Sequence, residues 1–242
     1  MKDFCGQNDS ETRLIKAIQR ALKIYDNGWV GMQTMTALAQ TVGAECWPLT
    51  VELYGQPCII ARDITASCPK AGVGEFKNCL SGSFSDGVEP VSVLVSEGKV
   101  IRGHSCHFWE GSPESVLYCT EDGDIGIKRV KTIHELPASL HWAVGGFGLL
   151  GQYDPEAEGF VGKFSDVLRR TNHTVLGEKD GWLYLLYCKN MTAQSVNTFC
   201  KTKLKLDKAV MLDGGHIAAI NGEESFAKIN TKQKQLYIIQ AV

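Results

Sequence analysis

Residues 174–188 have the sequence TVLGEKDGWLYLLYC, in which Asp180-Gly181 separates two runs rich in valine, leucine and aromatic side chains. Such residues favour strands, and Asp-Gly between two runs of this kind is one of the strongest short signals for a β-hairpin. The stretch therefore predicts two antiparallel strands joined by a tight turn.

Similar β-prone runs extend outward from this hairpin in both directions, with turn signals such as Asp122-Gly123 and Asn221-Gly222 between them. One helix interrupts them, from Ala193 to about Cys200, with Thr192 as its N-cap. The remaining runs are 49–54, 58–64, 91–95, 100–102, 115–119, 125–130, 140–144, 209–212, 217–220 and 236–239. We therefore expect a strand-rich mixed α/β domain over residues 47–242.

The first 46 residues have a helical pattern instead. Apolar residues recur on one face over 12–24, Asp26-Asn27-Gly28 ends that run, and a second short helix is expected over 33–40. The fold class expected for the whole chain is α+β, with a small N-terminal helical domain at 1–46. Because two short helices bury little core, a helical hairpin that binds nothing remains the alternative.

The turn between these helices carries a more specific pattern. Ile18-Gln19 precedes Asp26-Asn27-Gly28, Gly31 follows, and Thr34 begins the next helix. Over residues 10–43 this order resembles the peptidoglycan-binding type 1 module. The resemblance implies a wall-binding module at 1–46 and peptidoglycan as a partner.

Composition excludes several classes of protein. Hydrophobic residues make up 44% and charged residues 21% of the 242 residues, as in ordinary globular proteins. The formal net charge of -2 lacks the basic excess of nucleic-acid-binding proteins. No apolar run has the length needed to cross a bilayer, and the N-terminus lacks a signal-peptide pattern. We expect no nucleic-acid or membrane partner, synthesis in the cytoplasm, and release by another route if the protein acts on a wall.

The nine cysteines form no Cys-x-x-Cys pair, so neither a zinc ribbon nor a thioredoxin-type site is expected. Reduced, mostly buried thiols are the simplest interpretation, and we expect no cofactor and no metal. Cys106 lies beside His104 and His107, which leaves open a nucleophile or metal site, although a structural role is commoner for such neighbours.

Residues 209–216, AVMLDGGH, place a carboxylate after an apolar run. Asp213 would lie at a strand end, with the Gly214 and Gly215 amides free to bind an anionic oxygen and His216 close by. The alternative is an ordinary hairpin, because Asp-Gly also favours a tight turn.

Two further segments carry groups suited to a sugar phosphate. Arg169 and Arg170 offer planar charged forks for a phosphate, and His173 could act as a general acid or base near neutral pH. Around residues 81–86, small hydroxylated residues and glycine could line a sugar pocket. A solvated surface loop is the alternative in both cases.

Six segments in order, from about residue 58 to the C-terminus, resemble the phosphodiester glycosidase family. The chain departs from the family motifs at Ser81 and Ser83, at His173 where the family has arginine, and at His216 and Ile217. The matching segments are Ser81-Gly82-Ser83-Phe84-Ser85, Glu97-Gly98-Lys99-Val100, Glu121–Ile127, Ala143–Leu150, His173-Thr174-Val175-Leu176-Gly177 with the following hairpin Asp180–Leu185, and Met211–Ile217.

This resemblance implies that residues 47–242 hydrolyse a sugar–phosphate diester in a cell-wall or glycan-derived substrate. Asp213 would act as base or as the anion facing the anomeric carbon, and His173 and His216 would donate to the leaving phosphate, whose charge Arg170 would hold. A second carboxylate would be Asp86 or Asp154. The implied substrate-binding residues are Arg169, Arg170, Thr174, Gly214, Gly215, Ser81, Gly82, Ser83 and Asp86.

Three alternatives stay open. The changed glycine motif is compatible with a glycan- or ligand-sequestering protein that does not cleave. Asp213, His173 and His216 could instead bind zinc. A phage or bacterial wall-lytic function describes the biological role of the protein and is compatible with the hydrolase hypothesis.

Overall fold

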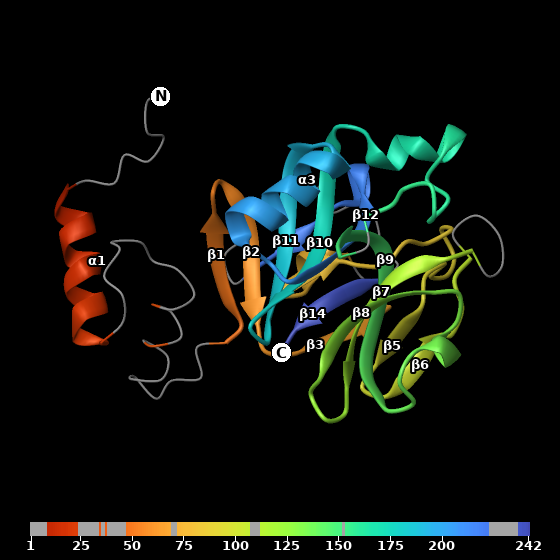
Figure 1. Cartoon of the computed structure of the whole chain (residues 1–242), viewed down its shortest axis with the longest axis horizontal. Helices are drawn as coiled ribbons and strands as arrows, with labels where there is room; N and C mark the ends of the chain where they lie inside the picture. Colours follow the sequence, from red (N-terminus) through yellow and green to blue (C-terminus); the bar gives the residue numbers. More distant parts are fainter. Residues whose placement is uncertain are drawn as a thin grey trace. The chain divides into compact units, whose positions relative to one another are not determined.

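Figure 1 shows the computed structural model of the chain. The structure describes residues 9–23, 34, 37, 47–68, 72–106, 112–151, 153–222 and 237–242. The chain divides into two compact units, Met1–Cys46 and Trp47–Val242. In the described part of the chain, no helix combines the length and apolar character that crossing a membrane requires.

In the first unit the described residues form one helix, α1 (Asp9–Ala21), which covers much of the helix expected at 12–24. Its Gln19 is buried, and Gln19 Nε2 donates a hydrogen bond to Thr34 Oγ1 at 2.8 Å. Of the second helix expected over 33–40, Thr34 and Ala37 are helical and the other positions lie outside the described residues.

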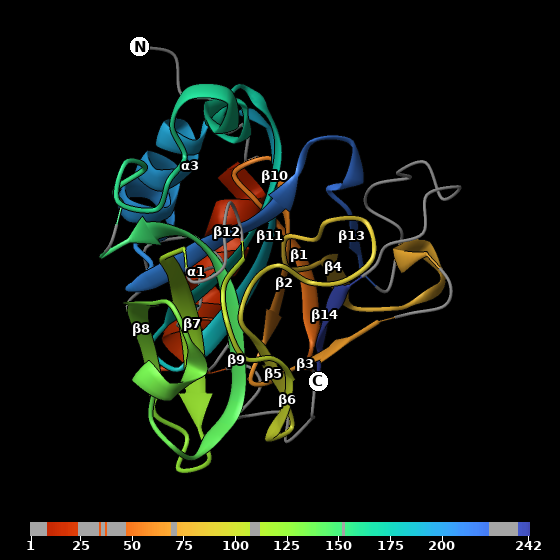
Figure 2. The ribbon, with the colours of Figure 1, turned by 90° about the vertical axis from the view of Figure 1, so that its right-hand side faces the viewer.

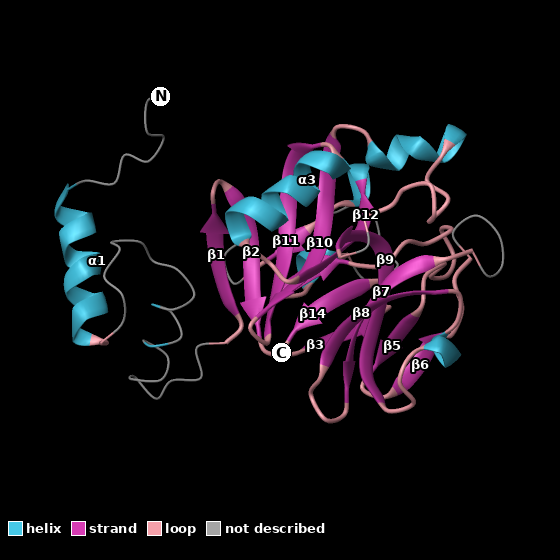
Figure 3. Cartoon of the chain, viewed as in Figure 1, coloured by secondary structure: helices cyan, strands magenta, loops and turns pink. Residues whose placement is uncertain are grey.

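The second unit is built on a 10-stranded antiparallel sheet, drawn in magenta with the other strands in Figure 3. Its main path runs β1-β2-β11-β10-β12-β9-β5-β6, and β7 pairs with both β8 and β9. These strands are β1 (Leu49–Leu53), β2 (Gln56–Ala61), β5 (Leu94–Ser96), β6 (Lys99–Arg102), β7 (Glu114–Thr120), β8 (Ile125–Val130), β9 (Leu140–Leu150), β10 (Thr171–Lys179), β11 (Trp182–Met191) and β12 (Lys208–Gly214).

A second, four-stranded antiparallel sheet has the order β13-β4-β14-β3. Figure 2 shows these strands grouped together on one side of the unit. They are β3 (Ile64–Ser67), β4 (Cys79–Ser81), β13 (Ile220–Asn221) and β14 (Ile238–Ala241). Leu80 and Ile239 of this sheet share one buried cluster with Leu117, Leu176 and Leu185 of the larger sheet, so the core lies between the two sheets.

The hairpin expected around Asp180-Gly181 is confirmed. β10 and β11 pair from Lys179↔Trp182 outward, and both turn residues have positive φ, which matches the twist of a tight hairpin. α3 (Ala193–Phe199) is also confirmed, with the Thr192 side chain accepting a hydrogen bond from the Ser195 amide. It packs against β9 and β11.

The expected α+β class with a small N-terminal helical domain is wrong. The described chain is dominated by strands, and its largest element is an antiparallel sheet. Before residue 47 the described residues show α1 and two isolated helical positions, not a helical domain. The described helices of the second unit are short and lie between strands in the chain, whereas β9 and β11 are long strands in which most residues are buried.

Candidate functional site

A pocket of about 400 Å³ opens where the end of β12 meets the loop that follows β4. It gathers residues from two segments that lie about 130 positions apart in the sequence, together with one residue near the C-terminus. The lining residues are Ser81, Gly82, Ser83, Ser85, Asp86, Gly87, Asp213, His216, Ile217 and Tyr237. Its volume lies within the range of small-molecule sites.

Asp213 is held by its backbone from both sides. Its amide donates to Gly82 O at 3.2 Å, and its carbonyl accepts a hydrogen bond from Thr174 Oγ1 at 2.6 Å. Its Oδ1 accepts from the Gly214 amide at 2.9 Å. The first two bonds tie the Asp213 backbone to the loop after β4 and to β10, so the sheet fixes the place of this residue in the pocket.

β12 does not turn back on itself at Asp213-Gly214, so the hairpin alternative is wrong. The chain passes through a 3-10 turn at Gly215–Ile217 and then enters β13, which pairs with β4 in the other sheet. Gly215 has φ +67°, a conformation that suits glycine. This turn brings the exposed imidazole of His216 to the pocket.

Gly214 supports the same arrangement from behind. A Cβ at this position would lie 2.9 Å from Asn172 O and 3.3 Å from His173 Nδ1. The close approach of β10 and β12 therefore requires a residue without a side chain here. Neither Gly214 nor Gly215 is among the lining residues, so their role in this structure is to place Asp213 and His216.

The loop after β4 forms the facing wall. Ser81 Oγ accepts a hydrogen bond from the Ala219 amide at 2.9 Å, and the Gly82 amide donates to Tyr237 O at 3.0 Å. A Cβ on Gly82 would lie 3.3 Å from Tyr237 O, which leaves little room for a larger residue. Ser83 is 3% exposed, and its Oγ has no hydrogen-bond partner among the described residues.

Asp86 contributes an exposed carboxylate at the rim. Its Oδ1 accepts hydrogen bonds from the amides of Val88 and Glu89 at 2.8 and 2.9 Å. The Glu89 and Val88 amides hold the pKa of this carboxyl below its ordinary value, and the charge of Arg102 acts in the same direction. Of the two candidates for a second carboxylate, Asp86 lines the pocket, whereas Asp154 lies 4.0 Å from Arg129 elsewhere.

Tyr237 is the lining residue that sequence reasoning missed most clearly. It is 9% exposed, and burial raises the pKa of its phenol, with Cys68, Glu89 and Asp86 adding to the effect. The phenol therefore stays protonated, and a hydrogen bond with the Cys68 side chain is among the causes of the raised pKa. The sequence run 236–239 predicted only a strand. Tyr237 comes close to Gly82 because β14 pairs with β4.

His173 lies behind the pocket and is not among its lining residues. It is 1% exposed, and its Nε2 lies 2.8 Å from Met191 O and 3.1 Å from Arg169 O. Since both partners are carbonyls, Nε2 carries the proton. Burial lowers the pKa of this imidazole, although the two carbonyls oppose the effect.

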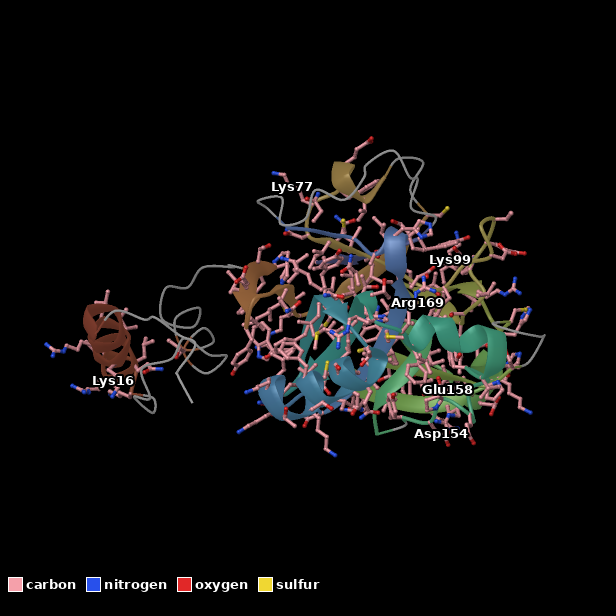
Figure 4. The ribbon with its side chains drawn as sticks, turned by 90° about the horizontal axis from the view of Figure 1, so that it is seen from above. Lys16, Lys77, Lys99, Asp154, Glu158 and Arg169 are labelled. Atoms are coloured by element: carbon pink, nitrogen blue, oxygen red, sulfur yellow. The ribbon has the colours of Figure 1, made fainter. Side chains whose placement is uncertain are left out.

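The two arginines expected to hold a phosphate are exposed and do not line the pocket. Arg170 Nη1 donates to Asn190 O at 2.9 Å. Arg169 contributes its carbonyl to His173. Figure 4 marks Arg169 among the side chains of the larger unit. No lysine or arginine is found among the described lining residues, which carry the carboxylates of Asp86 and Asp213.

The described residues contain no group of three or more His, Cys, Asp or Glu arranged to hold a metal ion. Asp213, His173 and His216 do not form one, because His173 Nε2 points at backbone carbonyls. Cys106 Sγ accepts from Arg102 Nη2 at 2.9 Å, and His107 lies outside the described residues.

Comparison with known proteins adds information on the fold. No family model matches the sequence, and no curated protein matches it. Among solved structures, the zebrafish N-acetylglucosamine-1-phosphodiester alpha-N-acetylglucosaminidase catalytic domain, auto-inhibited by its pro-peptide, superposes with a TM-score of 0.58 and 15% identity over 80% of each chain. The larger unit thus has a phosphodiester glycosidase-like fold.

A second solved structure, a hypothetical protein from Synechocystis, has a TM-score of 0.51 and 10% identity, over 79% of this chain and 60% of that one. At such identities the phosphodiester glycosidase-like fold is what the comparisons show. A fold of this kind does not by itself determine the chemistry of its site.

Proposed function

We propose that the unit Trp47–Val242 hydrolyses a sugar–phosphate diester in the pocket that Asp213, His216 and the loop 81–87 line. The observation that carries this proposal is the convergence of a carboxylate and an imidazole on a hydroxyl-lined pocket of about 400 Å³. A phosphodiester glycosidase-like fold supports the choice of reaction class.

Asp213 is suited to act at the anomeric carbon, where the bond breaks. Cleavage between an anomeric carbon and a phosphate oxygen passes through a sugar with developing positive charge. A fixed carboxylate stabilises that charge, or takes a proton from the attacking water. The backbone bonds to Gly82 and Thr174 hold Asp213 in place before substrate arrives, so little reorganisation is needed.

His216 and Asp86 have complementary roles in the proposal. The exposed His216 imidazole donates a hydrogen bond or a proton to the leaving phosphate. The amides of Glu89 and Val88 keep Asp86 ionised, so it is suited to accept hydrogen bonds from sugar hydroxyls rather than to donate a proton. His173, buried and bound to carbonyls, acts as a positioning residue behind Gly214.

The test is product release from a panel of sugar-1-phosphodiesters, followed by mass spectrometry. We expect a free sugar from the wild-type protein and a loss of at least about 100-fold in kcat for Asp213→Asn, because a general base of this kind contributes about that much. Circular dichroism checks that the variant remains folded. Full turnover by Asp213→Asn on the same substrate would exclude the assigned role.

A non-catalytic glycan- or ligand-binding protein is the second candidate. The observation in its favour is that the described lining residues supply no lysine or arginine to a phosphate. Retention of a ligand through gel filtration, with no product from any diester of the panel, would favour this candidate over the hydrolase.

A cell-wall substrate, peptidoglycan as a partner and a phage or bacterial wall-lytic role stay predictions of the sequence, as do cytoplasmic synthesis and the lack of a nucleic-acid partner. Co-sedimentation of the full chain with purified peptidoglycan tests the first group. Binding that an excess of soluble sugar-1-phosphodiester does not remove would indicate a wall contact outside the pocket.

A further inference from the structure

Ser83 differs from Ser81, which lines the same pocket, in its hydrogen bonding. Ser81 Oγ is engaged by the Ala219 amide, whereas Ser83 Oγ is buried without a partner among the described residues. A buried hydroxyl that makes no hydrogen bond destabilises the fold. A native protein that keeps such a group has a reason, and here the residue lines a pocket.

Hydrogen bonding within the described part of the chain does not fix the side-chain rotamer of Ser83. Serine has three staggered χ1 rotamers, and no hydrogen bond holds Oγ in its present one. A ligand in the pocket can therefore draw the hydroxyl toward itself and satisfy it. The gain on binding is larger than for a hydroxyl that must first leave water or another partner.

The charges of the pocket restrict what this ligand is. Asp86 and Asp213 line it with carboxylates, and the described lining adds no lysine or arginine. Arg102 acts on Asp86 from outside the lining. A sugar ring that carried its own carboxylate would add a second negative charge to that of the phosphate in front of two carboxylates, whereas neutral ring hydroxyls can donate to those carboxylates and pair with Ser83 and Tyr237.

We infer that the pocket takes a neutral, hydroxyl-bearing sugar ring and that Ser83 recognises one hydroxyl of that ring. This inference rests on the proposed function for the presence of a sugar. It goes further because it states that the ring is uncharged and that Ser83 recognises it.

The experiment measures binding, not turnover. The probes are methyl esters of C-glycosyl phosphonates of glucose, galactose, mannose and N-acetylglucosamine, in which CH₂ replaces the anomeric oxygen, so the protein cannot cleave them. Calorimetric titration of the full chain identifies the ring that binds. A uronic acid analogue of that ring should bind at least tenfold more weakly, since it adds a charge facing two carboxylates.

A cycle of single changes then identifies the contact. Ser83→Ala should weaken binding of the full probe roughly tenfold, and one monodeoxy probe should bind the wild-type protein more weakly by a similar factor. The Ser83→Ala protein should bind that monodeoxy probe no more weakly than it binds the full probe, because both changes remove the same hydrogen bond. Ser105→Ala is the matched control, since Ser105 is also buried and pairs with Ser112 outside the pocket lining.

The outcomes separate the two proposals. The role of Ser83 would be overturned if the losses in affinity from Ser83→Ala and from removal of a ring hydroxyl multiplied for every deoxy probe. It would also be overturned if Ser83→Ala left the affinity for the full probe unchanged. Tighter binding of the uronic acid analogue, or no binding of any probe whose sugar ring is uncharged, would overturn the neutral ring. Hydrolysis of a different diester that depends on Asp213 would leave the proposed function standing in either case.

Discussion

Two buried polar clusters of the larger unit differ in one respect, the completeness of their hydrogen bonds. At Glu158, which Figure 4 labels beside Asp154, the carboxylate is fully buried and accepts bonds from Ser115 Oγ at 2.7 Å and from Gly148 N at 3.1 Å. Arg129 Nε adds a third contact at 3.2 Å. At the pocket, by contrast, Ser83 Oγ has no partner among the described residues.

This difference distinguishes polar groups that stabilise the fold from polar groups that are available to bind a ligand. Glu158 joins β7, β8 and β9 to the segment that carries it, and every contact is internal. Asp213 is equally well held through its backbone, yet its side chain faces a pocket. A raised pKa at a buried acid such as Glu158 is therefore not by itself a sign of catalysis in this protein.

The largest expected effect is on stability, at the closed cluster. Glu158→Ala leaves the Ser115 hydroxyl and the Gly148 amide without their acceptor and removes the anion beside Arg129. We expect a loss of roughly 3 kcal/mol in the free energy of unfolding, as for other broken buried pairs. Urea denaturation followed by circular dichroism measures it.

Glu158→Gln provides the matched comparison, because its amide oxygen still accepts hydrogen bonds and its loss should be smaller. Neither variant should change affinity for the pocket probe by more than about twofold at a temperature where both are folded. A specific loss of ligand affinity with unchanged stability would remove the distinction between the two clusters.

His173 provides an intermediate effect, visible as a pH dependence of stability. Burial lowers its pKa in the folded protein below the ordinary value of 6.5, so between pH 6.5 and the folded pKa the unfolded chain binds more protons. Stability should therefore fall as the pH drops below about 6.5. Glu158 contributes with the opposite sign, since burial raises its pKa and protonation then favours the folded state.

The contribution of His173 is isolated by comparison with His173→Gln. The difference in unfolding free energy between wild type and variant should shrink as the pH falls from 7 to 5. NMR titration of the imidazole reports the folded pKa directly. A difference that stays constant or grows on acidification would mean that this imidazole is charged in the folded protein.

Much of the larger unit could be predicted from sequence because its signals are local. The hairpin at Asp180-Gly181 and the N-cap at Thr192 each depend on a few adjacent residues, and both are confirmed. The fold class was wrong because the pattern over 12–40 was given the weight of a domain. Strand extensions such as Gly145-Gly146 in β9 were also missed, since glycine signals a turn unless a neighbouring strand lies close.

The pocket was predictable only in part. The motifs around Ser81 and Asp213 drew attention to two segments that the structure does bring together. Tyr237 could not be found, because its place beside Gly82 follows from sheet pairing between distant segments. The same limit affected His173, whose residue type suggests acid–base chemistry while its burial and carbonyl partners come from β11 and the loop before β10.

The smallest expected effect concerns Arg170, which sequence reasoning placed on the substrate phosphate. In the structure its guanidinium donates to Asn190 O on the surface and does not line the pocket. Arg170→Ala should therefore change kcat/KM by less than about twofold and stability by less than about 0.5 kcal/mol, as is usual for exposed side chains. Steady-state kinetics on the diester that the panel identifies measures the first quantity. A tenfold or larger rise in KM would show that the loop carrying Arg170 moves onto the ligand, and the phosphate would then be held by a cation that the pocket's described lining lacks.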